Sequence, residues 1–342
     1  MVKMRTDDFS FELPPELIAQ RPATPRDASR LMVLRRGAGT LSHHIFRDLP
    51  RLLTPGDLLV VNDTRVMAAR LHGFRDGTGG VVEALLVRPF TDCRWEALFR
   101  PARQAVPGRG FRFATAGGEL GATVVSRGEG VVVLDFDRPF DPGTVGSVPL
   151  PPYITEYTGD PERYQTVYSR DPRSAAAPTA GLHFTEQLLD ELSATGIEHV
   201  AVTLEVGPGT FKPVTVEDPR DHHLHPEHVT VPAATATRIR EAKAEGRRVI
   251  AIGTTVVRTL EHVARECGAV APFDGWTSLR ILPDDSFRVV DGIITNFHLP
   301  RSTLLMLICA FAGTEFVLDA YRTAVRERYR FYSFGDAMLI LP

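Results

Sequence analysis

Cysteine, lysine and long apolar runs are scarce in this chain of 342 residues. The three cysteines, Cys93, Cys267 and Cys309, stand far apart without a CxxC spacing, so neither a disulfide framework nor a thiolate metal site is indicated and a reducing compartment fits. No run approaches the ~18 apolar residues that cross a membrane, and residues 1–11 carry acidic side chains where a signal peptide has an apolar core. The sequence therefore predicts a cytoplasmic protein without a membrane partner.

A large excess of charge of either sign is also missing. The formal net charge is −3, which argues against a basic surface over the whole molecule but leaves room for a local patch that binds nucleic acid. Lysine occurs only at positions 3, 212 and 243, and we attribute the preference for arginine to coding bias rather than to bidentate phosphate contacts. With 43% hydrophobic and 24% charged residues the composition is that of a globular protein, and the length predicts two domains.

Both ends of the chain carry α/β patterns. A short helix started by proline is expected near residues 11–18, and residues 57–62 are typical of a buried strand. From residue 151 onward helical and strand patterns alternate to the end. The predicted fold class is α/β, with a layered main domain formed by residues 1–71 and 151–342.

The stretch between these two parts has a different texture. Over residues 72–150, short valine-rich runs such as 81–87 and 130–134 alternate with glycine turns, and no convincing helical period is present. This pattern predicts a small β-barrel insert domain that interrupts the α/β domain.

The second α/β part contains a series of expected elements. Ser302 is a plausible N-cap for an almost wholly apolar helix that must be buried. The last strand is expected to carry Phe334, Gly335 and Asp336. Helices are expected near 188–196, 233–245, 303–312 and 315–328, and strands at 199–206 and 248–252.

Four polar segments lie between apolar runs and suggest one shared cleft, namely 178–184, 253–259, 295–300 and 329–338. In the second segment a strand is followed by Gly253 and by Thr254 and Thr255, which open a helix. Free N–H groups and the helix dipole there favour a carboxylate or phosphate, although a simple helix cap is an equally good interpretation. Arg258, one turn later, could reach the same anion or could neutralise Glu261 on the surface.

Two histidines are candidates for moving a proton. His183 and His298 each stand between apolar neighbours, and an imidazole in a partly dry cleft titrates near neutrality. For each taken alone, a hydrogen-bonded core histidine is the commoner outcome. Asp63, Thr64 and Arg65 directly follow a strand, where they form either a simple turn or a carboxylate and a guanidinium at the strand end.

Two further patterns carry weaker signals. The histidine-rich segment 221–228 suggests a metal, but Pro226 breaks any HExxH-type helical face and no cysteine is near, so no metal is expected. Residues 329–332, with Arg328 and Arg330 interleaved, either stack bases and hold phosphate or form a half-buried strand with alternating aromatics.

Together these segments closely resemble the S-adenosylmethionine:tRNA ribosyltransferase-isomerases, a family that acts late in queuosine biosynthesis. The resemblance runs from Phe9 to Met338, nearly the full chain. It is most specific at 62–66 (NDTRV), 164–168 (YQTVY), 177–184 (APTAGLHF), 253–255 (GTT), 295–300 (TNFHLP) and 333–338 (SFGDAM). It implies an α/β domain interrupted by a β-barrel insert, which agrees with the change of texture described above.

The resemblance also implies a reaction. The family transfers and isomerises the ribosyl part of S-adenosylmethionine onto the aminomethyl group of 7-aminomethyl-7-deazaguanine in a tRNA anticodon, giving epoxyqueuosine, adenine and methionine. S-adenosylmethionine is then a co-substrate, the anticodon loop of a tRNA is the partner, and no metal or bound cofactor is implied. The sulfonium acidifies the neighbouring 5′ carbon, so a base could remove that proton and an acid could assist the departure of adenine from C1′.

Site roles follow from this reaction as hypotheses. His183 and His298 are the expected proton-transfer groups, and Asp336 is expected to orient or bind the amine. Residues 254–255 and Arg258 are expected to hold the methionine carboxylate or a tRNA phosphate. The full set of substrate-binding candidates is Asp63, Thr64, Arg65, Thr179, Gly181, Glu205, His225, Glu227, Thr254, Thr255, Arg258, Asn296, Arg328 and Arg330.

The sequence departs from the family's usual motifs at several polar positions. Glu205 stands where a histidine is usual, Val256 where a serine is usual, and Val81 where a lysine is expected, while Pro226 interrupts a usual His-Ser-Glu. These changes keep two other hypotheses open. One is a paralogue that uses S-adenosylmethionine on a small-molecule acceptor, and the other is a non-catalytic RNA-binding protein.

Overall fold

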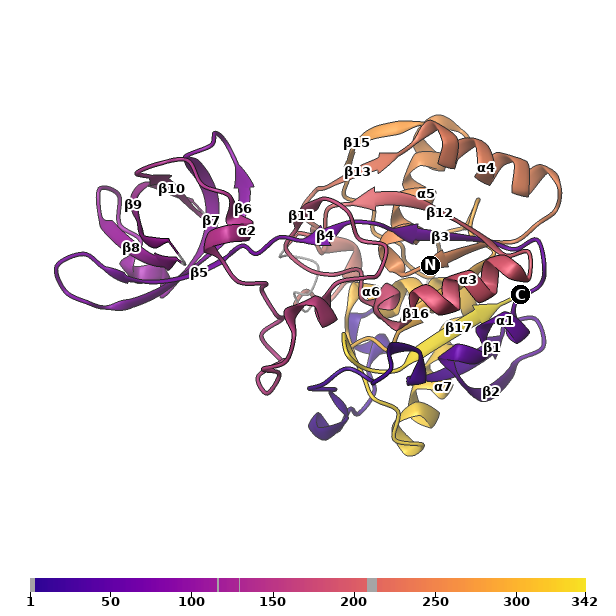
Figure 1. The fold of residues 1–342 in the computed structure, drawn as a ribbon. Coiled ribbons are helices and arrows are strands. Elements are labelled where there is room, and N and C mark those ends of the chain that lie inside the picture. Colours follow the sequence, from indigo (N-terminus) through magenta and orange to yellow (C-terminus); the bar gives the residue numbers. More distant parts are fainter. Residues whose placement is uncertain (1–3, 116, 129, 208–213) are drawn as a thin grey trace. The chain divides into compact units, whose positions relative to one another are not determined.

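A computed structural model of the chain (Figure 1) describes residues 4–115, 117–128, 130–207 and 214–342. The chain divides into two compact units. The first comprises residues 1–64, 152–171 and 177–342, and the second comprises residues 65–151 and 172–176. The second unit therefore takes in residues 65–71, which were expected in the α/β domain, together with a short strand from much later in the chain.

A nine-stranded sheet forms the centre of the first unit, in the order β15-β13-β12-β3-β14-β16-β17-β1-β2. Strands β12, β3, β14 and β16 are parallel neighbours, β17 is antiparallel to β16, and β1 is parallel to β17. The strands span Arg30–Arg35 (β1), Thr40–Ile45 (β2), Leu58–Asn62 (β3), Glu198–Leu204 (β12), Glu227–Val231 (β13), Val249–Ile252 (β14), Phe273–Thr277 (β15), Gly292–Asn296 (β16) and Ala337–Leu341 (β17).

Apolar cores lie on both faces of this sheet, which explains the unbroken apolar runs of its central strands. In β14, Val249 and Ala251 join one core while Ile250 and Ile252 join the other. Helices α4 (Ala233–Ala244), α5 (Thr254–Cys267), α6 (Thr303–Ala312) and α7 (Thr314–Arg326) pack into the first core, and α1 (Leu49–Leu52) and α3 (Glu186–Ala194) into the second. Short 3₁₀ helices lie at Thr6–Phe9 (η1), Pro15–Leu17 (η2), Arg26–Ala28 (η3), Phe46–Asp48 (η4), Pro161–Tyr164 (η6), Thr179–His183 (η7) and Pro219–Asp221 (η8).

The apolar helix α6 is buried as predicted, and the Ser302 hydroxyl accepts a hydrogen bond from the Leu305 N–H at 3.2 Å as its N-cap. No single helix in the described ranges is long and apolar enough to cross a membrane; α6 and α7 together reach that length and composition, with a bend of 118° between them.

One expectation about the end of the chain was wrong, and one of two open alternatives is not found there. Residues 334–336 lie before the last strand rather than in it, because β17 begins at Ala337. Residues 329–332 form no strand; Phe331 makes a single bridge to Ile18, and its ring and that of Tyr329 are buried in the core. The alternating aromatic residues are buried side chains of a loop. The same alternation is typical of a half-buried strand, so the sequence pattern does not distinguish the two.

The second unit contains a closed six-stranded barrel in the order β10-β7-β6-β5-β8-β9, which confirms the predicted β-barrel insert. Its core is rich in phenylalanine, and alternate residues of each strand point inward. The barrel strands are Arg70–Arg75 (β5), Val81–Pro89 (β6), Arg94–Arg100 (β7), Gly110–Thr115 (β8), Gly118–Arg127 (β9) and Val132–Phe136 (β10). The unit also contains Arg65–Val66 (β4) paired in parallel with Pro172–Ser174 (β11), helix α2 (Pro142–Val145) and a 3₁₀ helix at Ala102–Gln104 (η5).

Candidate active site

The polar segments of the sequence meet at one edge of the nine-stranded sheet. Since β12, β3, β14 and β16 are parallel neighbours, their carboxyl ends lie along the same edge, where Glu205, Asp63, Gly253 and Asn296 follow or end the strands. β17 runs the other way, so Asp336, just before it, lies at this edge too. Open α/β sheets bind their ligands at this edge.

A cavity at these strand ends, here called the strand-end cavity, is lined by residues that include Thr179, Thr255, Asn296, His298 and Tyr332. The space free of protein atoms is about 500 Å³, open solvent included. The first four of these residues come from three of the segments in which the sequence predicts site residues.

Two buried polar atoms at this cavity have no hydrogen-bond partner among the described residues, Asn296 Oδ1 and Thr255 Oγ1. Asn296 is only 2% exposed. Its Nδ2 donates to the Tyr332 carbonyl oxygen at 3.0 Å and to His183 Nε2 at 3.2 Å, whereas its Oδ1 accepts no hydrogen bond from the described residues. Because buried polar atoms are nearly always paired, a ligand or a water at this place would be hydrogen bonded by both atoms, Asn296 Oδ1 as an acceptor and the Thr255 hydroxyl as a donor or an acceptor.

His298 places a neutral imidazole in the wall of the same cavity. Its Nε2 lies 2.9 Å from the Thr295 hydroxyl, and its backbone N–H donates to the Tyr321 hydroxyl at 3.1 Å. Burial lowers the pKa of His298 to about 3. The ring is therefore uncharged at neutral pH, and burial disfavours its protonated form.

His183 is hydrogen bonded through both ring nitrogens. The Asn296 amide can only donate to Nε2, so Nε2 is the acceptor and Nδ1 carries the hydrogen, which it donates to the Ser29 hydroxyl at 2.7 Å. The ring stacks on Phe46 with centroids 5.0 Å apart, and burial lowers the pKa of His183 to about 4. His183 thus contacts Asn296, and a separate small cavity that it lines also contains Arg26.

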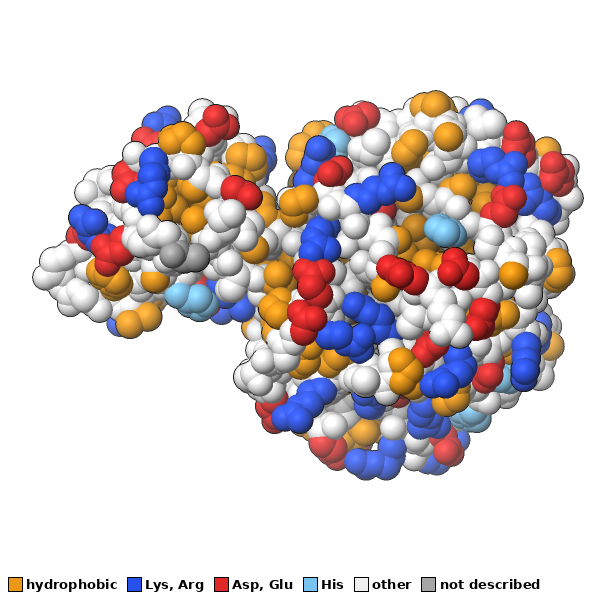
Figure 2. All heavy atoms as spheres, viewed as in Figure 1, with side chains coloured by type: hydrophobic (Ala, Val, Ile, Leu, Met, Phe, Trp, Pro, Cys, Tyr) orange, Lys and Arg blue, Asp and Glu red, His pale blue; other side chains and the backbone are white. Residues whose placement is uncertain are grey.

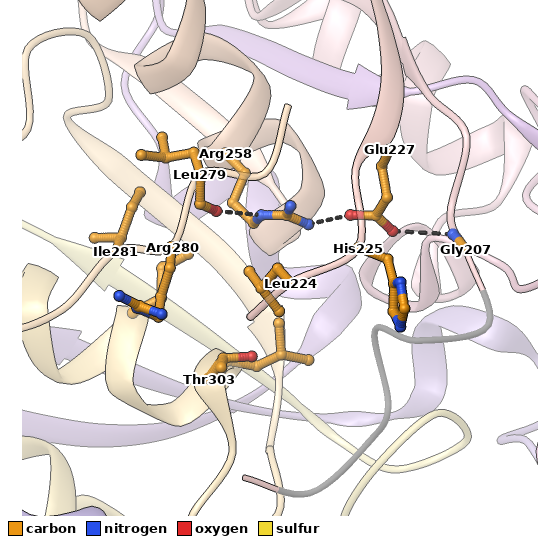
Figure 3. A pocket seen from close by; sticks show the side chains of 11 residues that line it. Gly207, Leu224, His225, Glu227, Arg258, Leu279, Arg280, Ile281 and Thr303 are labelled. Atoms are coloured by element: carbon orange, nitrogen blue, oxygen red, sulfur yellow. Dashed lines mark hydrogen bonds and ion pairs between the residues drawn. The ribbon is translucent and has the colours of Figure 1, made fainter. Parts of the chain in front are cut away.

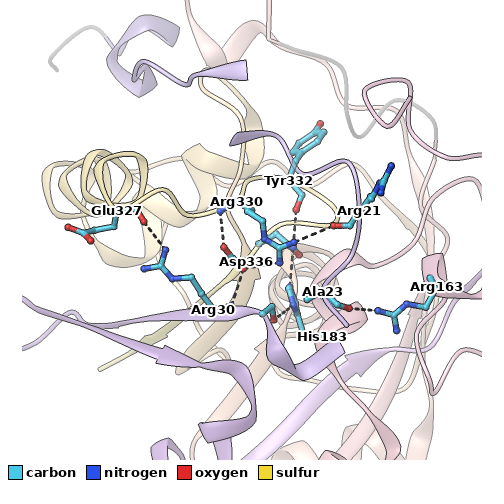
Figure 4. A network of polar contacts seen from close by, with 11 residues as sticks. Arg21, Ala23, Arg30, Arg163, His183, Glu327, Arg330, Tyr332 and Asp336 are labelled. Carbon is cyan, nitrogen blue, oxygen red and sulfur yellow. Dashed lines mark hydrogen bonds and ion pairs between the residues drawn. The ribbon is translucent and has the colours of Figure 1, made fainter. Parts of the chain in front are cut away.

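Asp336 is 1% exposed and holds a loop together (Figure 4). Its Oδ1 accepts from the Arg30 backbone N–H at 3.0 Å and from Arg330 Nη2 at 3.1 Å, and its Oδ2 accepts from the Arg330 backbone N–H at 2.8 Å. The loop that these bonds close carries Tyr332 and Ser333, which line the strand-end cavity.

A second cavity, here called the arginine–glutamate cavity, surrounds a buried ion pair between Arg258 Nη1 and Glu227 Oε2 (Figure 3). Arg258 Nε donates to the Leu279 carbonyl oxygen at 2.9 Å, and Glu227 Oε1 accepts from the Gly207 N–H at 2.9 Å. The suggestion that Arg258 neutralises Glu261 was wrong. Glu261 is fully buried, and its carboxylate accepts from the backbone N–H groups of residues 288–290.

Asp63, Thr64, Arg65 and Glu205 are not among the residues that line either cavity. Asp63 accepts a hydrogen bond from the Thr203 hydroxyl at 2.6 Å, and the Thr64 N–H donates to Asn62 Oδ1 at 3.2 Å. Glu205 lies 3.7 Å from His228 Nδ1. Arg65 begins β4 and so belongs to the second unit.

Gly181 has a packing requirement, since a Cβ there would collide with the Tyr168 hydroxyl and the Thr166 methyl group. Thr254 is buried at the strand-end cavity, and His225 lines the arginine–glutamate cavity. Arg328 is exposed.

Sequence reasoning missed Thr295, Tyr332 and Ser333 at the strand-end cavity, and Ser29 beside His183. The first three lie in the polar segments 295–300 and 329–338, so membership of those segments was an available signal. Ser29 offered no local signal, because its contact with His183 joins positions 154 apart. In segment 221–228, as elsewhere in the described ranges, no three His, Cys, Asp or Glu side chains are grouped to hold a metal ion.

Basic and acidic side chains are intermixed on the face drawn in Figure 2, in keeping with the net charge of −3. This view offers no continuous basic surface from which a nucleic-acid partner would be inferred. The surface charge on this face therefore does not identify a nucleic-acid partner.

Comparison with known proteins shows similarity to a family model, to curated relatives and to a solved structure. The family model described as "Queuosine biosynthesis protein" matches residues 6–340. The S-adenosylmethionine:tRNA ribosyltransferase-isomerases of Moorella thermoacetica and Symbiobacterium thermophilum are 54% and 53% identical, each over 99% of this chain and 100% of the relative. The crystal structure of S-adenosylmethionine tRNA ribosyltransferase from Thermotoga maritima is 39% identical, with a TM-score of 0.56 over 98% of this chain and 100% of that one.

Proposed function

The chain belongs to the queuosine biosynthesis protein family, and on this basis we propose that it is an S-adenosylmethionine-dependent ribosyltransferase-isomerase. It transfers and isomerises the ribosyl moiety of S-adenosylmethionine onto 7-aminomethyl-7-deazaguanine in the anticodon loop of a tRNA, giving epoxyqueuosine, adenine and methionine. Identity of 53% and 54% over the full length of two relatives with this name carries the proposal. We propose that this reaction takes place in the cytoplasm.

The strand-end cavity is the proposed site of the nucleoside. S-adenosylmethionine has hydrogen-bond donors in its adenine amino group and its ribose hydroxyls, and the cavity offers the acceptor Asn296 Oδ1 and the Thr255 hydroxyl, which accepts or donates. Thr254 and Thr255 also begin α5, whose positive dipole end favours partial negative charge on the ligand.

His298 is the proposed proton acceptor. Its neutral imidazole lines the cavity, and the proton on the 5′ carbon is acidified by the adjacent sulfonium. His183 is proposed to orient Asn296 rather than to meet the substrate, since both of its ring nitrogens are hydrogen bonded. Asp336 is proposed to orient the loop that carries Tyr332, and Arg328 and Arg330 beside it are proposed contacts for tRNA phosphates.

The departures from the usual motifs do not fall on the strand-end cavity. Val256 is fully buried in the apolar core, so a serine-to-valine change there removes no contact to a ligand in the cavity. Glu205 is directed at His228. These positions therefore leave the proposed nucleoside site unchanged, a feature that both S-adenosylmethionine-dependent hypotheses share, and the tRNA acceptor is supported by the relatives that are 53% and 54% identical.

Release of adenine tests the proposal. Purified protein is mixed with S-adenosylmethionine and tRNA that carries the 7-aminomethyl-7-deazaguanine precursor, and adenine is quantified by chromatography. Adenine release that requires the tRNA supports the proposal. Adenine release with a small amine only overturns it in favour of the paralogue, and tight tRNA binding without adenine overturns it in favour of a non-catalytic RNA-binding protein.

The role of His298 has its own test in the same assay. His298→Ala is expected to lower the rate about 100-fold or more, the usual worth of a general base. His223→Ala, which removes an exposed imidazole, serves as the matched control and keeps the wild-type rate. A loss of less than about tenfold for His298→Ala removes this residue from the mechanism.

A further inference from the structure

Arg258 carries an unused hydrogen-bond donor inside the protein. The residue is 5% exposed and lines the arginine–glutamate cavity, and its Nη2 has no partner among the described residues. The other two guanidinium nitrogens are occupied by Glu227 and by the Leu279 carbonyl oxygen. A buried charged donor without a hydrogen-bond partner indicates an acceptor on a ligand.

The arginine–glutamate cavity adjoins the strand-end cavity. Leu304, at the start of α6, lines both. Val206 lines one and Gly207 the other, and Thr254 and Arg258, one turn apart on α5, are likewise divided between the two. The start of α6, the start of α5 and residues 206–207 thus contribute to the walls of both cavities. We therefore consider one extended ligand that occupies both cavities.

The charge of the ion pair selects the kind of acceptor. Glu227 neutralises Arg258, so the pair offers a donor without a net positive charge, and a phosphate dianion placed at Nη2 would be repelled by the neighbouring carboxylate. A group that carries a negative and a positive charge together avoids this repulsion. The walls formed by Leu224, Ile281 and Leu307 suit methylene carbons.

An α-amino acid with an aliphatic side chain has all of these properties. We propose that the arginine–glutamate cavity binds the amino-acid end of S-adenosylmethionine, with the carboxylate accepting a hydrogen bond from Arg258 Nη2, while the nucleoside lies in the strand-end cavity. This inference rests on the proposed function. It chooses the methionine carboxylate over a tRNA phosphate, the two anions between which the sequence left the choice open.

Binding of S-adenosylmethionine and of its decarboxylated form, which keeps the sulfonium nucleoside and the amine, tests the proposal by calorimetry. Wild-type protein is expected to bind S-adenosylmethionine roughly 10- to 100-fold more tightly, the worth of a hydrogen bond between charged groups. The double variant Arg258→Gln with Glu227→Gln is expected to bind the two ligands within about twofold of each other. Both charges are removed together because a single change would leave a buried charge uncompensated.

The matched control is the double variant Arg248→Gln with Asp57→Asn. This ion pair, 2.8 Å from Arg248 Nε to Asp57 Oδ1, precedes β14 and β3 and so lies at the opposite edge of the sheet. It is expected to keep the wild-type preference, and the helical signal at 222 nm checks that both double variants are folded.

Three outcomes overturn the inference, namely equal binding of both ligands by the wild type, a preference that survives in the Arg258/Glu227 double variant, or competition by inorganic phosphate that only this variant loses. Failure of the proposed function is a separate result. If the wild type prefers the carboxylate and the double variant does not, yet no adenine is released with tRNA, the binding site stands and the reaction does not.

Discussion

Lowering the pH from 8 to 5 should destabilise the first unit through two buried histidines. Burial lowers the pKa of His183 to about 4 and that of His298 to about 3, against an ordinary value of 6.5. Between these values the unfolded chain binds protons that the folded chain refuses, so the free energy of unfolding falls as the pH falls. The contribution is fully present above pH 6.5 and is lost progressively below it.

The magnitude follows from the size of these shifts. In the unfolded chain, pH 5 lies about 1.5 units below the ordinary imidazole pKa, so the imidazole is protonated there. Each pH unit is worth about 1.4 kcal/mol, so each buried histidine lowers the free energy of unfolding by about 2 kcal/mol. The two together remove about 4 kcal/mol, a large part of the ~5–15 kcal/mol that stabilises an ordinary domain.

Urea unfolding followed by circular dichroism at 222 nm reports on the part of the chain that contains both histidines, because α3 to α7 all belong to the first unit. Between pH 8 and 5, His183→Gln and His298→Gln should each lose about 2 kcal/mol less than the wild type. His223→Gln, at an exposed position, should lose as much as the wild type. Equal losses in the wild type and in both buried-site variants would refute the assignment of neutral imidazoles.

Two further predictions concern the packing and the proton positions around the strand-end cavity. Gly181→Ala should lower the free energy of unfolding by about 1–3 kcal/mol in the same urea assay, because the added Cβ meets the Tyr168 hydroxyl and the Thr166 methyl group; an unchanged midpoint would show that these neighbours can move aside. The neutral ring of His183 should carry its hydrogen on Nδ1, which two-bond ¹H–¹⁵N spectra of histidine-labelled protein detect; a hydrogen on Nε2 would contradict the donor assigned to Asn296.

Local patterns explain which parts of the molecule could be predicted from sequence. The strand, glycine and two threonines at 249–255 dictate a helix start at a strand end, and Gly253, with φ +92°, makes the turn between β14 and α5. The barrel follows from short valine-rich runs between glycine turns, and the buried helix α6 follows from an N-cap serine before an almost wholly apolar run. Such signals lie within one segment, and the fold class depends on little else.

The pairings inside the site could not be read from sequence because they join distant segments. Arg258 and Glu227 are 31 positions apart, and the nearest acid along the helix, Glu261, was the natural but incorrect partner. One signal was available. Residues 227, 229 and 231 are the buried positions of β13, so alternation in that strand places Glu227 on the buried face, where a carboxylate requires a cation.

The division of labour between the two central histidines depends on the amide of Asn296. Turning this amide over would set Oδ1 against the Tyr332 carbonyl oxygen and would place the acceptor nitrogen of His183 opposite an oxygen, so two donor bonds would become two repulsions. The Tyr332 carbonyl oxygen can only accept, so it fixes the amide nitrogen on this side, and the amide in turn fixes Nε2 of His183 as an acceptor. A histidine can therefore be needed for the reaction without carrying a proton, because its contribution is to keep Asn296 Oδ1 available to the ligand. Loss of activity on replacing His183 would not by itself identify an acid or a base, whereas the tautomer and the binding measurements distinguish the two roles.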